Sequence, residues 1–546
     1  MIQARLHRNP TSALRRQASR LALGVLCACL LVPVAAVRAA TFDLSTATIA
    51  DIQAAMDKGA LSSEKLVQLY LARINAYDAQ GPALNTIIVL NANALDEARA
   101  LDAERKAKGP RSPFHGVPIL VKDVYDTAEM PTAGGFKPMA TSRPTKDSFI
   151  VGRLRAAGAI ILGKLNQSDW YGIAPPSGST IKGTVISPYN PKKSPGGSSS
   201  GTGSAMAAWF GAVGLGSDTT GSIVIPSTLA NLVGFSTTHG LVSRTGQMWS
   251  SPSQESGGPM GRSVYDCAAV LSIIAGYDAA DLVTQAGVGK IPDQPYTSFI
   301  SKDGLKGARI GVLREMVRKG AMHEEGTALF EQAVADFKTA GAIIVDPVLT
   351  GLNLPEAQAG ASAARFEVAT AINKYLSALP PDAPIRTVDE MIAKGGALVK
   401  PNIIASAKMP PLDRNPEFAA ALKQQDMLRN ALISVMDKYE LDAVILPYRT
   451  ALDTDMRTTP NPPGAGGGGA AARESQNYLA SVTGLPTIVV PGGFFPSDGM
   501  PFAVQFIGKP FTEPTMIKVA SGYEAATHHR KSPALTPALP GEVFEY

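Results

Sequence analysis

A run rich in glycine, serine and threonine occupies residues 192–227 and contains the residue types that nucleophilic catalysis requires. It holds two polar turns, at residues 195–201 and 217–222, which flank a short apolar segment. Because each glycine inside a regular element costs roughly 0.5–1 kcal/mol relative to alanine, a packed helix would not hold this many. Apolar residues inside the run argue against a flexible Gly/Ser linker. We therefore interpret the run as a candidate active-site segment.

One serine of the run fits the G-x-S-x-G pattern of the α/β-hydrolase nucleophile, with Ser199 at the centre of residues 197–201. That fold requires a buried strand that leads directly into the serine turn. The preceding residues, 189–195, contain two prolines and no apolar run. The sequence therefore disfavours Ser199 as a nucleophile of this type.

The sequence lacks the patterns of two further classes of enzyme. The six histidines are scattered, without an H-x-x-x-H pair, so no cluster has the spacing of zinc ligands. No G-x-G-x-x-G follows a predicted strand, which argues against a dinucleotide-binding fold. We expect neither a metal site nor a cofactor.

A serine nucleophile activated by a lysine remains, and Lys122 is the candidate because it ends the apolar segment 117–121. Lysine acts as a base only where burial lowers its pKa, since a low dielectric disfavours the charged form. However, a lysine at the end of an apolar strand is more commonly a surface residue whose stem packs on apolar side chains. The spacing alone leaves both interpretations open.

The elements that must position these residues follow an α/β pattern. Residues 44–110 show helical periodicity. Three later segments each predict a helix followed by an apolar strand, and they are residues 148–166, 325–346 and 417–447. Such alternation predicts a large α/β/α sandwich whose sheet is flanked by helices on both faces.

The first 39 residues predict a secretory signal peptide, because arginines precede an apolar run over residues 21–37. The run is short and interrupted by Pro33, so we expect no stable membrane span. Loss of this segment removes six arginines and no acid, which changes the formal net charge from +5 to −1. It also leaves Cys267 as the single cysteine, so no intramolecular disulfide is expected. We expect an exported protein, periplasmic or secreted, that binds no nucleic acid.

Five ordered blocks of the sequence together resemble the amidase signature family. They are residues 116–123, 195–201, 216–223, 258–266 and 484–508. The resemblance extends from residue 44 to residue 530. It implies the amidase signature fold, a single α/β/α sandwich with a mixed central sheet. It also implies an amidase that cleaves a carboxamide C–N bond to a carboxylic acid and an amine or ammonia.

The resemblance implies a Ser–cis-Ser–Lys triad and overturns the surface interpretation of Lys122. Ser222 is the expected nucleophile, Lys122 the ultimate base, and Ser198 the bridging serine. A cis peptide bond is expected between Gly197 and Ser198. The expected oxyanion hole consists of backbone N–H groups, those of Thr219, Thr220, Gly221 and Ser222.

Two further residues, Ser199 and Asp218, match family positions that support the triad by hydrogen bonding, although both are also ordinary turn formers. We expect a helix to begin at Ser222 and to extend through residues 223–232, so that its dipole favours an anion there. Together these residues would allow an acyl-enzyme mechanism.

The sequence departs from the family pattern at two positions. Val224 stands where most relatives carry arginine, although secreted peptide amidases of the family are similar here. Glu255 stands where aspartate is more usual. An arginine-mediated ion pair with Asp218 is therefore not expected.

The resemblance also suggests an organisation of the chain. After the signal peptide we expect one amidase domain, residues 40–546, with four parts: N-terminal helices at 44–110, a catalytic core at 112–300, a variable helical insertion at 350–415 and the C-terminal part of the core at 440–530. Variable loops, expected at residues 350–415 and 450–475, would shape the substrate pockets.

Three functions fit the sequence. The first is an exported amidase that acts, as a monomer or homodimer, on a small-molecule or peptide amide. The second is the amidotransferase subunit that supplies ammonia for mischarged tRNA, which the signal peptide argues against. The third is a non-catalytic periplasmic binding protein, which the intact triad positions argue against.

Overall fold

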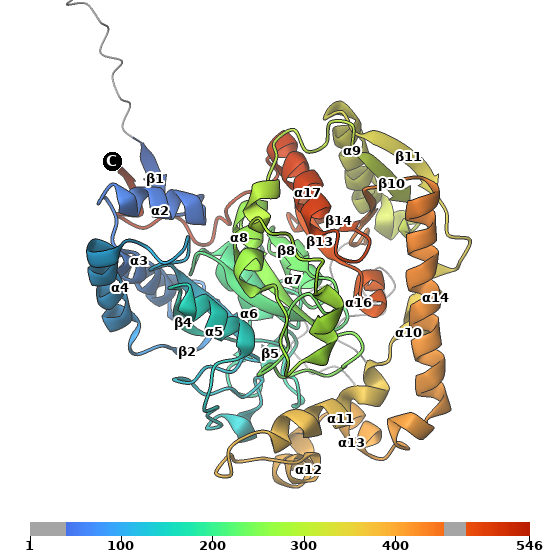
Figure 1. The fold of residues 1–546 in the computed structure, drawn as a ribbon, viewed down its shortest axis with the longest axis horizontal. Helices are drawn as coiled ribbons and strands as arrows, with labels where there is room; N and C mark the ends of the chain where they lie inside the picture. The colour runs from blue at the N-terminus through green and yellow to red at the C-terminus, as the bar shows by residue number, and fades with distance from the viewer. Residues whose placement is uncertain (1–39, 452–476) are drawn as a thin grey trace, which may run out of the picture. The chain divides into compact units, whose positions relative to one another are not determined.

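The computed structural model describes residues 40–451 and 477–546 (Figure 1). The predicted signal peptide, residues 1–39, lies outside the described residues, as does nearly all of the predicted loop at 450–475. Residues Phe42–Phe544 form one compact unit, and the sheet and the candidate site belong to it.

An eleven-stranded mixed sheet is the centre of this unit. Across the sheet the strands are β11 (Ile343–Val348), β10 (Arg309–Leu313), β12 (Ala443–Pro447), β14 (Pro501–Ile507), β13 (Thr487–Phe494), β8 (Val233–Ser236), β9 (Ser256–Gly261), β7 (Gly214–Asp218), β3 (Pro118–Lys122), β4 (Ile160–Leu165) and β2 (Ile87–Leu90). Two small sheets pair β1 (Thr41–Asp43) with β15 (Val543–Glu545), and β5 (Gly178–Ser179) with β6 (Gly183–Thr184).

Helices flank the sheet, so the predicted α/β/α fold class is confirmed (Figure 1). The α-helices of the described residues are α2 (Ile49–Asp57), α3 (Ser63–Ile74), α4 (Ala94–Lys108), α5 (Phe149–Ala156), α6 (Ser200–Ala207), α7 (Val224–Leu229), α8 (Val264–Ile274), α9 (Glu324–Thr339), α10 (Leu354–Ala361), α11 (Ala364–Ser377), α12 (Val388–Gly395), α13 (Pro401–Ala407), α14 (Pro416–Lys438), α16 (Leu479–Thr483) and α17 (Glu513–Thr527).

The strands that carry the candidate site lie in the interior of the sheet. β3 pairs in parallel with both β4 and β7, and every residue of β3 is buried. Parallel strands covered on both faces appear in a sequence as continuous apolar runs, which is why the residues before Lys122 predicted a strand correctly.

The three helix–strand units predicted from the sequence are confirmed. They are α5 with β4, α9 with β11, and α14 with β12. The N-terminal region differs from its expectation, because β2 lies between helices α3 and α4. β2 is an edge strand that pairs antiparallel with β4, and its four consecutive apolar residues have no helical period.

Residues 350–415, predicted to be helical, contain α10 to α13. α10 packs on α14 through a buried apolar cluster that includes Leu354, Ala361, Leu428 and Leu432. We refer to α10 through α13 as the helical insertion. Through this packing the insertion is anchored to α14 and hence to the sheet.

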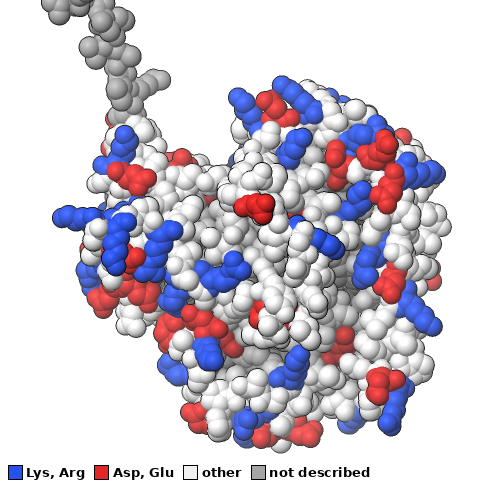
Figure 2. All heavy atoms as spheres, viewed as in Figure 1, with Lys and Arg blue, Asp and Glu red and all other residues white. Residues whose placement is uncertain are grey.

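The described residues show no segregation of surface charge on the face in view and no membrane-spanning helix. On the face shown in Figure 2, basic and acidic side chains are intermingled rather than gathered into patches of one sign. None of the helices in the described residues combines the length and the apolar character needed to cross a membrane.

Candidate active site

Lys122 is the last residue of β3, and its side chain is fully buried. Its Nζ donates to Ser198 Oγ at 2.7 Å and to Ser217 Oγ at 2.9 Å. Burial lowers its pKa from 10.5 to about 7, although the carboxylates of Glu255 and Asp218 oppose this fall. The interpretation of Lys122 as a surface residue is therefore wrong, and a neutral amine is accessible near physiological pH.

Ser198 lies in the first polar turn, and the Gly197–Ser198 peptide bond is cis, as the resemblance implied. The backbone carbonyl of Ser198 accepts a hydrogen bond from the N–H of Ser168 at 3.0 Å. A Cβ at position 197 would lie 2.4 Å from Ser168 Oγ, so a larger residue there would displace the Ser168 hydroxyl. These contacts fix the serine whose hydroxyl faces Lys122.

Ser217, which the sequence analysis did not single out, is the second hydroxyl partner of Lys122. It belongs to β7, one residue before Asp218. The buried Ser199 Oγ contacts its backbone twice, accepting from Ser217 N and donating to Ser217 O, both at 3.3 Å. Ser217 is the first residue of the second polar turn, just after the short apolar segment, and this position was a signal that could have identified it.

Asp218 holds the second polar turn together. Its Oδ1 accepts from the N–H of Gly221 at 2.6 Å and from Ser481 Oγ at 2.7 Å, and its Oδ2 accepts from Ile223 N at 3.0 Å. Gly221 has a φ of +98°, which a residue with a side chain rarely adopts. Asp218 therefore shapes the turn on which Ser222 stands.

The oxyanion donors expected from the sequence need one revision. The N–H of Gly221 is already bonded to Asp218, so it is not free for a substrate oxygen. Within the described part of the chain, the N–H groups of Thr219, Thr220 and Ser222 have no hydrogen-bond acceptor. These three remain available to bind an anion.

Ser222 lies in the same turn and is partly exposed. Among the described residues, no hydrogen bond joins its hydroxyl to that of Ser198. The helix predicted to begin at Ser222 is α7, which begins at Val224 and ends at Leu229, so that prediction was wrong in its bounds. Asn231, with a φ of +52°, turns the chain toward β8 and prevents the expected extension to residue 232.

Glu255 is fully buried just before β9. Its Oε2 accepts from Thr219 Oγ1 at 2.6 Å and from the N–H of Ser250 at 3.3 Å. Burial raises its pKa from 4.5 to about 7, while the Thr219 hydrogen bond and the charge of Lys122 oppose the rise. Glu255 thus contributes a carboxyl group to the surroundings of Lys122.

Val224 lies in an apolar cluster with Tyr448, Val489 and Ala503, and Ile225 packs against it. The carboxylate of Asp218 is hydrogen-bonded by backbone N–H groups and by Ser481.

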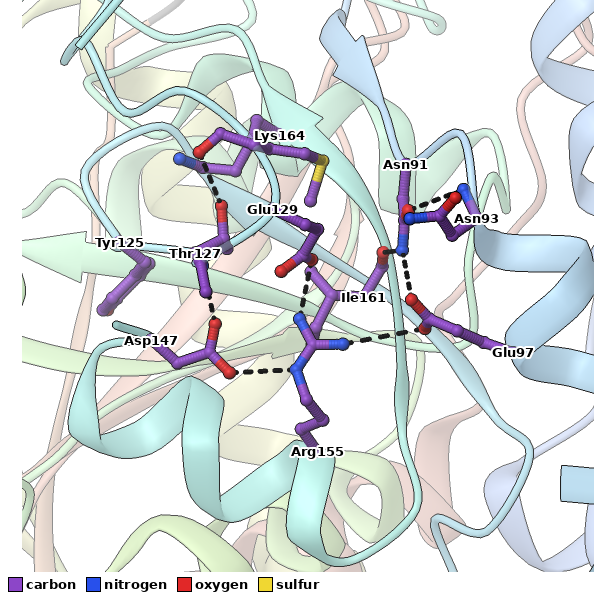
Figure 3. Close-up of polar contacts among 12 residues, drawn as sticks. Asn91, Asn93, Glu97, Tyr125, Thr127, Glu129, Asp147, Arg155, Ile161 and Lys164 are labelled. Carbon is purple, nitrogen blue, oxygen red and sulfur yellow. Dashed lines mark hydrogen bonds and ion pairs between the residues drawn. The ribbon is translucent and has the colours of Figure 1, made fainter. Parts of the chain in front are cut away.

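The loop that follows Lys122 is anchored by an ion-pair cluster (Figure 3). Arg155, on α5, donates to Asp147 at 2.9 Å and to Glu129 at 2.6 Å, and lies 3.6 Å from Glu97. Figure 3 shows the guanidinium group between these carboxylates, which come from α4 and from the segment between β3 and α5. The cluster holds that segment against two helices, which limits movement beyond the end of β3.

No cluster of three or more histidine, cysteine, aspartate or glutamate side chains suited to a metal ion occurs among the residues that the structure describes. Among the described residues Cys267 is a free cysteine, and it is buried on α8.

The fold places the protein among amide-hydrolysing enzymes. The peptide amidase from Stenotrophomonas maltophilia superposes with a TM-score of 0.78 and 33% sequence identity, over 90% of this chain and 99% of that chain. The similarity therefore covers the sheet and the helical insertion together.

Sequence comparison identifies the family. Residues 65–517 match the family model described as Amidase. A probable amidase of Arabidopsis thaliana is 31% identical over 517 residues, which cover 90% of this chain and 92% of the relative. A glutamyl-tRNA(Gln) amidotransferase subunit of Methylococcus capsulatus is 31% identical over 508 residues, 89% of this chain and 98% of the relative. The chain belongs to the amidase signature family, and the resemblance seen in the sequence is confirmed.

Proposed function

We propose that the protein hydrolyses a carboxamide C–N bond through an acyl-enzyme, with Ser222 as nucleophile, Ser198 as bridging residue and Lys122 as base. The observation that carries this proposal is the buried Lys122 amine, 2.7 Å from Ser198 Oγ, at a site where burial brings the pKa of the lysine to about 7. A neutral amine in this position accepts a proton from a hydroxyl.

In the proposed first step, neutral Lys122 takes a proton from Ser198 while Ser198 takes one from Ser222. The Ser222 oxygen bonds to the amide carbonyl carbon, and the proton returns to the departing amine as the C–N bond breaks. Water then attacks the acyl-enzyme by the same route and releases the carboxylic acid. The absence of a Ser198–Ser222 hydrogen bond in the described residues does not conflict with this route, because such bonds often form only when substrate is bound.

The proposed oxyanion hole consists of the N–H groups of Thr219, Thr220 and Ser222, because Gly221 donates to Asp218. Three backbone donors aimed at one oxygen stabilise the charge that develops in the transition state. Removal of one such donor typically costs about 10²–10³ in rate. Asp218 and Ser199 support the hole and the triad by fixing the turn and β7.

The proposed substrate is a small-molecule or peptide amide. The similarity to a peptide amidase supports the peptide class. The apolar surroundings of Val224 support a substrate that carries no anionic group at that point. The amidotransferase subunits are comparably similar in sequence, so glutamine belongs among the compounds to be tested. We further propose export to the periplasm or the medium, on the basis of residues 1–39.

The proposal is tested with purified mature protein and its Ser222→Ala variant. Release of p-nitroaniline or ammonia is measured for a panel of aryl amides, peptide amides and glutamine. We expect hydrolysis of at least one aryl or peptide amide by the wild type, and a loss of at least about two orders of magnitude in the variant. Equal rates for the two proteins on every compound would overturn the proposal, and cleavage of glutamine alone would favour the amidotransferase function.

A further inference from the structure

Thr219 is held by two consecutive residues from the segment that precedes β9. Gln254 Nε2 donates to the backbone carbonyl of Thr219 at 3.0 Å. Glu255 Oε2 accepts from the Thr219 hydroxyl at 2.6 Å. Gln254 and Glu255 are both buried, so neither contact exchanges readily with water. The main chain and the side chain of Thr219 are thus fixed at the same time.

The contact to the Thr219 carbonyl has a geometric consequence for the next N–H group. The carbonyl of Thr219 and the N–H of Thr220 belong to one planar trans peptide and point in opposite directions. A donor that fixes the carbonyl therefore fixes the direction of the Thr220 N–H. That N–H has no acceptor within the described residues and is one of the three proposed oxyanion donors.

The amide group of Gln254 is itself fixed by the helical insertion. Its Oε1 accepts from the N–H of Ala363, at the start of α11, at 2.6 Å, and from Gln425 Nε2, on α14, at 3.3 Å. The N–H of Ala363 only donates and the carbonyl of Thr219 only accepts, so the amide of Gln254 has one orientation that satisfies both. A glutamine is required for this bridge.

The chain around Gln254 is anchored to the same insertion. Glu367, on α11, accepts hydrogen bonds from Ser251 Oγ, from Ser253 N at 3.3 Å and from Ser253 Oγ at 2.8 Å. Residues 251–254 are therefore fixed to α11 at several points. The position of α11 is transmitted through this segment to the Thr219 carbonyl.

We propose that Gln254 is a positioning residue for amide hydrolysis. It directs the Thr220 N–H toward the developing oxyanion, and it connects the Thr219–Thr220 peptide to the helical insertion. This inference rests on the proposed function, because it assigns a role within the same site. Gln254 does not touch the reacting atoms, and it acts through the Thr219–Thr220 peptide.

The test compares Gln254→Met with Gln425→Met. Both replacements exchange a buried glutamine of one polar cluster for an apolar side chain of similar length, but only the first removes a bond to Thr219. In Gln425→Met, Gln254 keeps its bond to Thr219 and the shorter of its two Oε1 contacts, the one from Ala363 N–H at 2.6 Å. We expect Gln254→Met to lower kcat for an aryl amide at least about tenfold, with KM changed less than about threefold, and Gln425→Met to leave kcat within about threefold of the wild type. Thermal unfolding verifies that both variants are folded.

A second variant and a second readout keep the test independent of folding and of the substrate. Gln254→Glu retains the oxygen that accepts from Ala363 but removes the donor to Thr219, and it should lose at least as much kcat. The rate of covalent labelling of Ser222 by a fluorophosphonate should fall by a factor similar to kcat in both Gln254 variants. Wild-type values in these variants, or equal losses in Gln425→Met, would overturn the role of Gln254. Absence of labelling at Ser222 in the wild type would instead show that the proposed function fails.

Discussion

Two buried lysines lie on neighbouring strands, and they differ in their partners. Lys122 ends β3 and Lys164 belongs to β4, and both side chains are fully buried. Lys122 donates to two serine hydroxyls. Lys164 Nζ lies 3.2 Å from Asp123 Oδ1, and it donates to Thr132 Oγ1 at 2.7 Å and to the Pro131 carbonyl at 3.0 Å.

Burial alone does not select the base, because it lowers the pKa of both lysines. For Lys164 the Asp123 carboxylate, in direct contact, is the strongest influence that opposes this fall. For Lys122 the opposing carboxylates, Glu255 and Asp218, form no ion pair with it among the described residues. We conclude that contact with hydroxyls instead of a carboxylate is what suits Lys122 to proton transfer, whereas Lys164 forms a structural ion pair.

The alternation of side chains along β3 explains why Lys122 and the following Asp123, the partner of Lys164, lie on opposite faces of the sheet. Val121 pairs with Lys164 across β3 and β4, and paired residues of parallel strands point to the same face. Lys122, one residue later, therefore points to the opposite face. Asp123 returns to the face of Lys164. The two environments are thus separated by the sheet itself.

The strongest test of the comparison removes the proposed base. We expect Lys122→Ala to lower kcat/KM by about 10²–10⁴ while the protein stays folded, because the hydroxyl partners that remain are neutral. Steady-state kinetics with the aryl amide and a thermal unfolding curve measure both effects. Ser198→Ala should lower kcat/KM by at least about two orders of magnitude, because it removes the hydroxyl that carries the proton between Ser222 and Lys122. Turnover near the wild-type level in either variant would refute the assigned relay.

The second test removes the carboxylate partner of the other lysine. Asp123→Asn leaves Lys164 buried without its counter-charge, and we expect unfolding free energy to fall by about 3–5 kcal/mol. Chemical denaturation measures the loss. As a control, the double variant Asp123→Asn/Lys164→Met removes both charges and should recover most of that stability. A single variant as stable as the wild type would show that the ion pair has no structural role.

The third test follows the charge of Lys122 with pH. Its pKa is lowered to about 7, so the amine is charged below this pH and neutral above it. Because the proposed base is the neutral form, kcat/KM should fall about tenfold for each pH unit below 7 and level off above it. A pH–rate profile between pH 5 and pH 9 measures this dependence. A maximum near pH 5 would argue against lysine as the base.

The smallest expected effect concerns Glu255. Its charge opposes the fall in the pKa of Lys122, so Glu255→Gln should move the rise in kcat/KM to lower pH. The two groups interact, and the observed midpoint therefore belongs to the pair. The position of the profile is the readout, since a loss of kcat alone would also follow from the lost Thr219 hydrogen bond. An unchanged midpoint would show that Glu255 does not influence the lysine.

The sequence predicted those parts of the fold and site that depend on local pattern. A continuous apolar run predicted β3, and ordered motifs indicated the cis Gly197–Ser198 peptide. It did not predict the bond from Gly221 N–H to Asp218, which depends on the exact turn conformation. The bounds predicted for α7 were wrong because the sequence does not show that Asn231 adopts a positive φ and turns the chain toward β8.

Contacts between distant segments were also beyond the sequence. Ser481 reaches Asp218 across 263 residues, and Gln254 joins Thr219 to Ala363. Glutamine and serine are mostly exposed in proteins, and the neighbouring residues in the sequence do not indicate that these two are buried. Glu255 was noticed as a departure from a motif, but its contact with Thr219 required coordinates.

The order of strands in the sheet has a consequence for synthesis. β8 and β12 belong to separate groups of strands, and the hairpin of β13 and β14 fills the space between them. This hairpin follows β8 and β12 in the chain, so a ribosome releases it after both of them. Until then β8 and β12 each present an unpaired edge, the kind of edge that recruits other strands. A polypeptide that lacks the hairpin therefore exposes two strand edges that can pair with other chains.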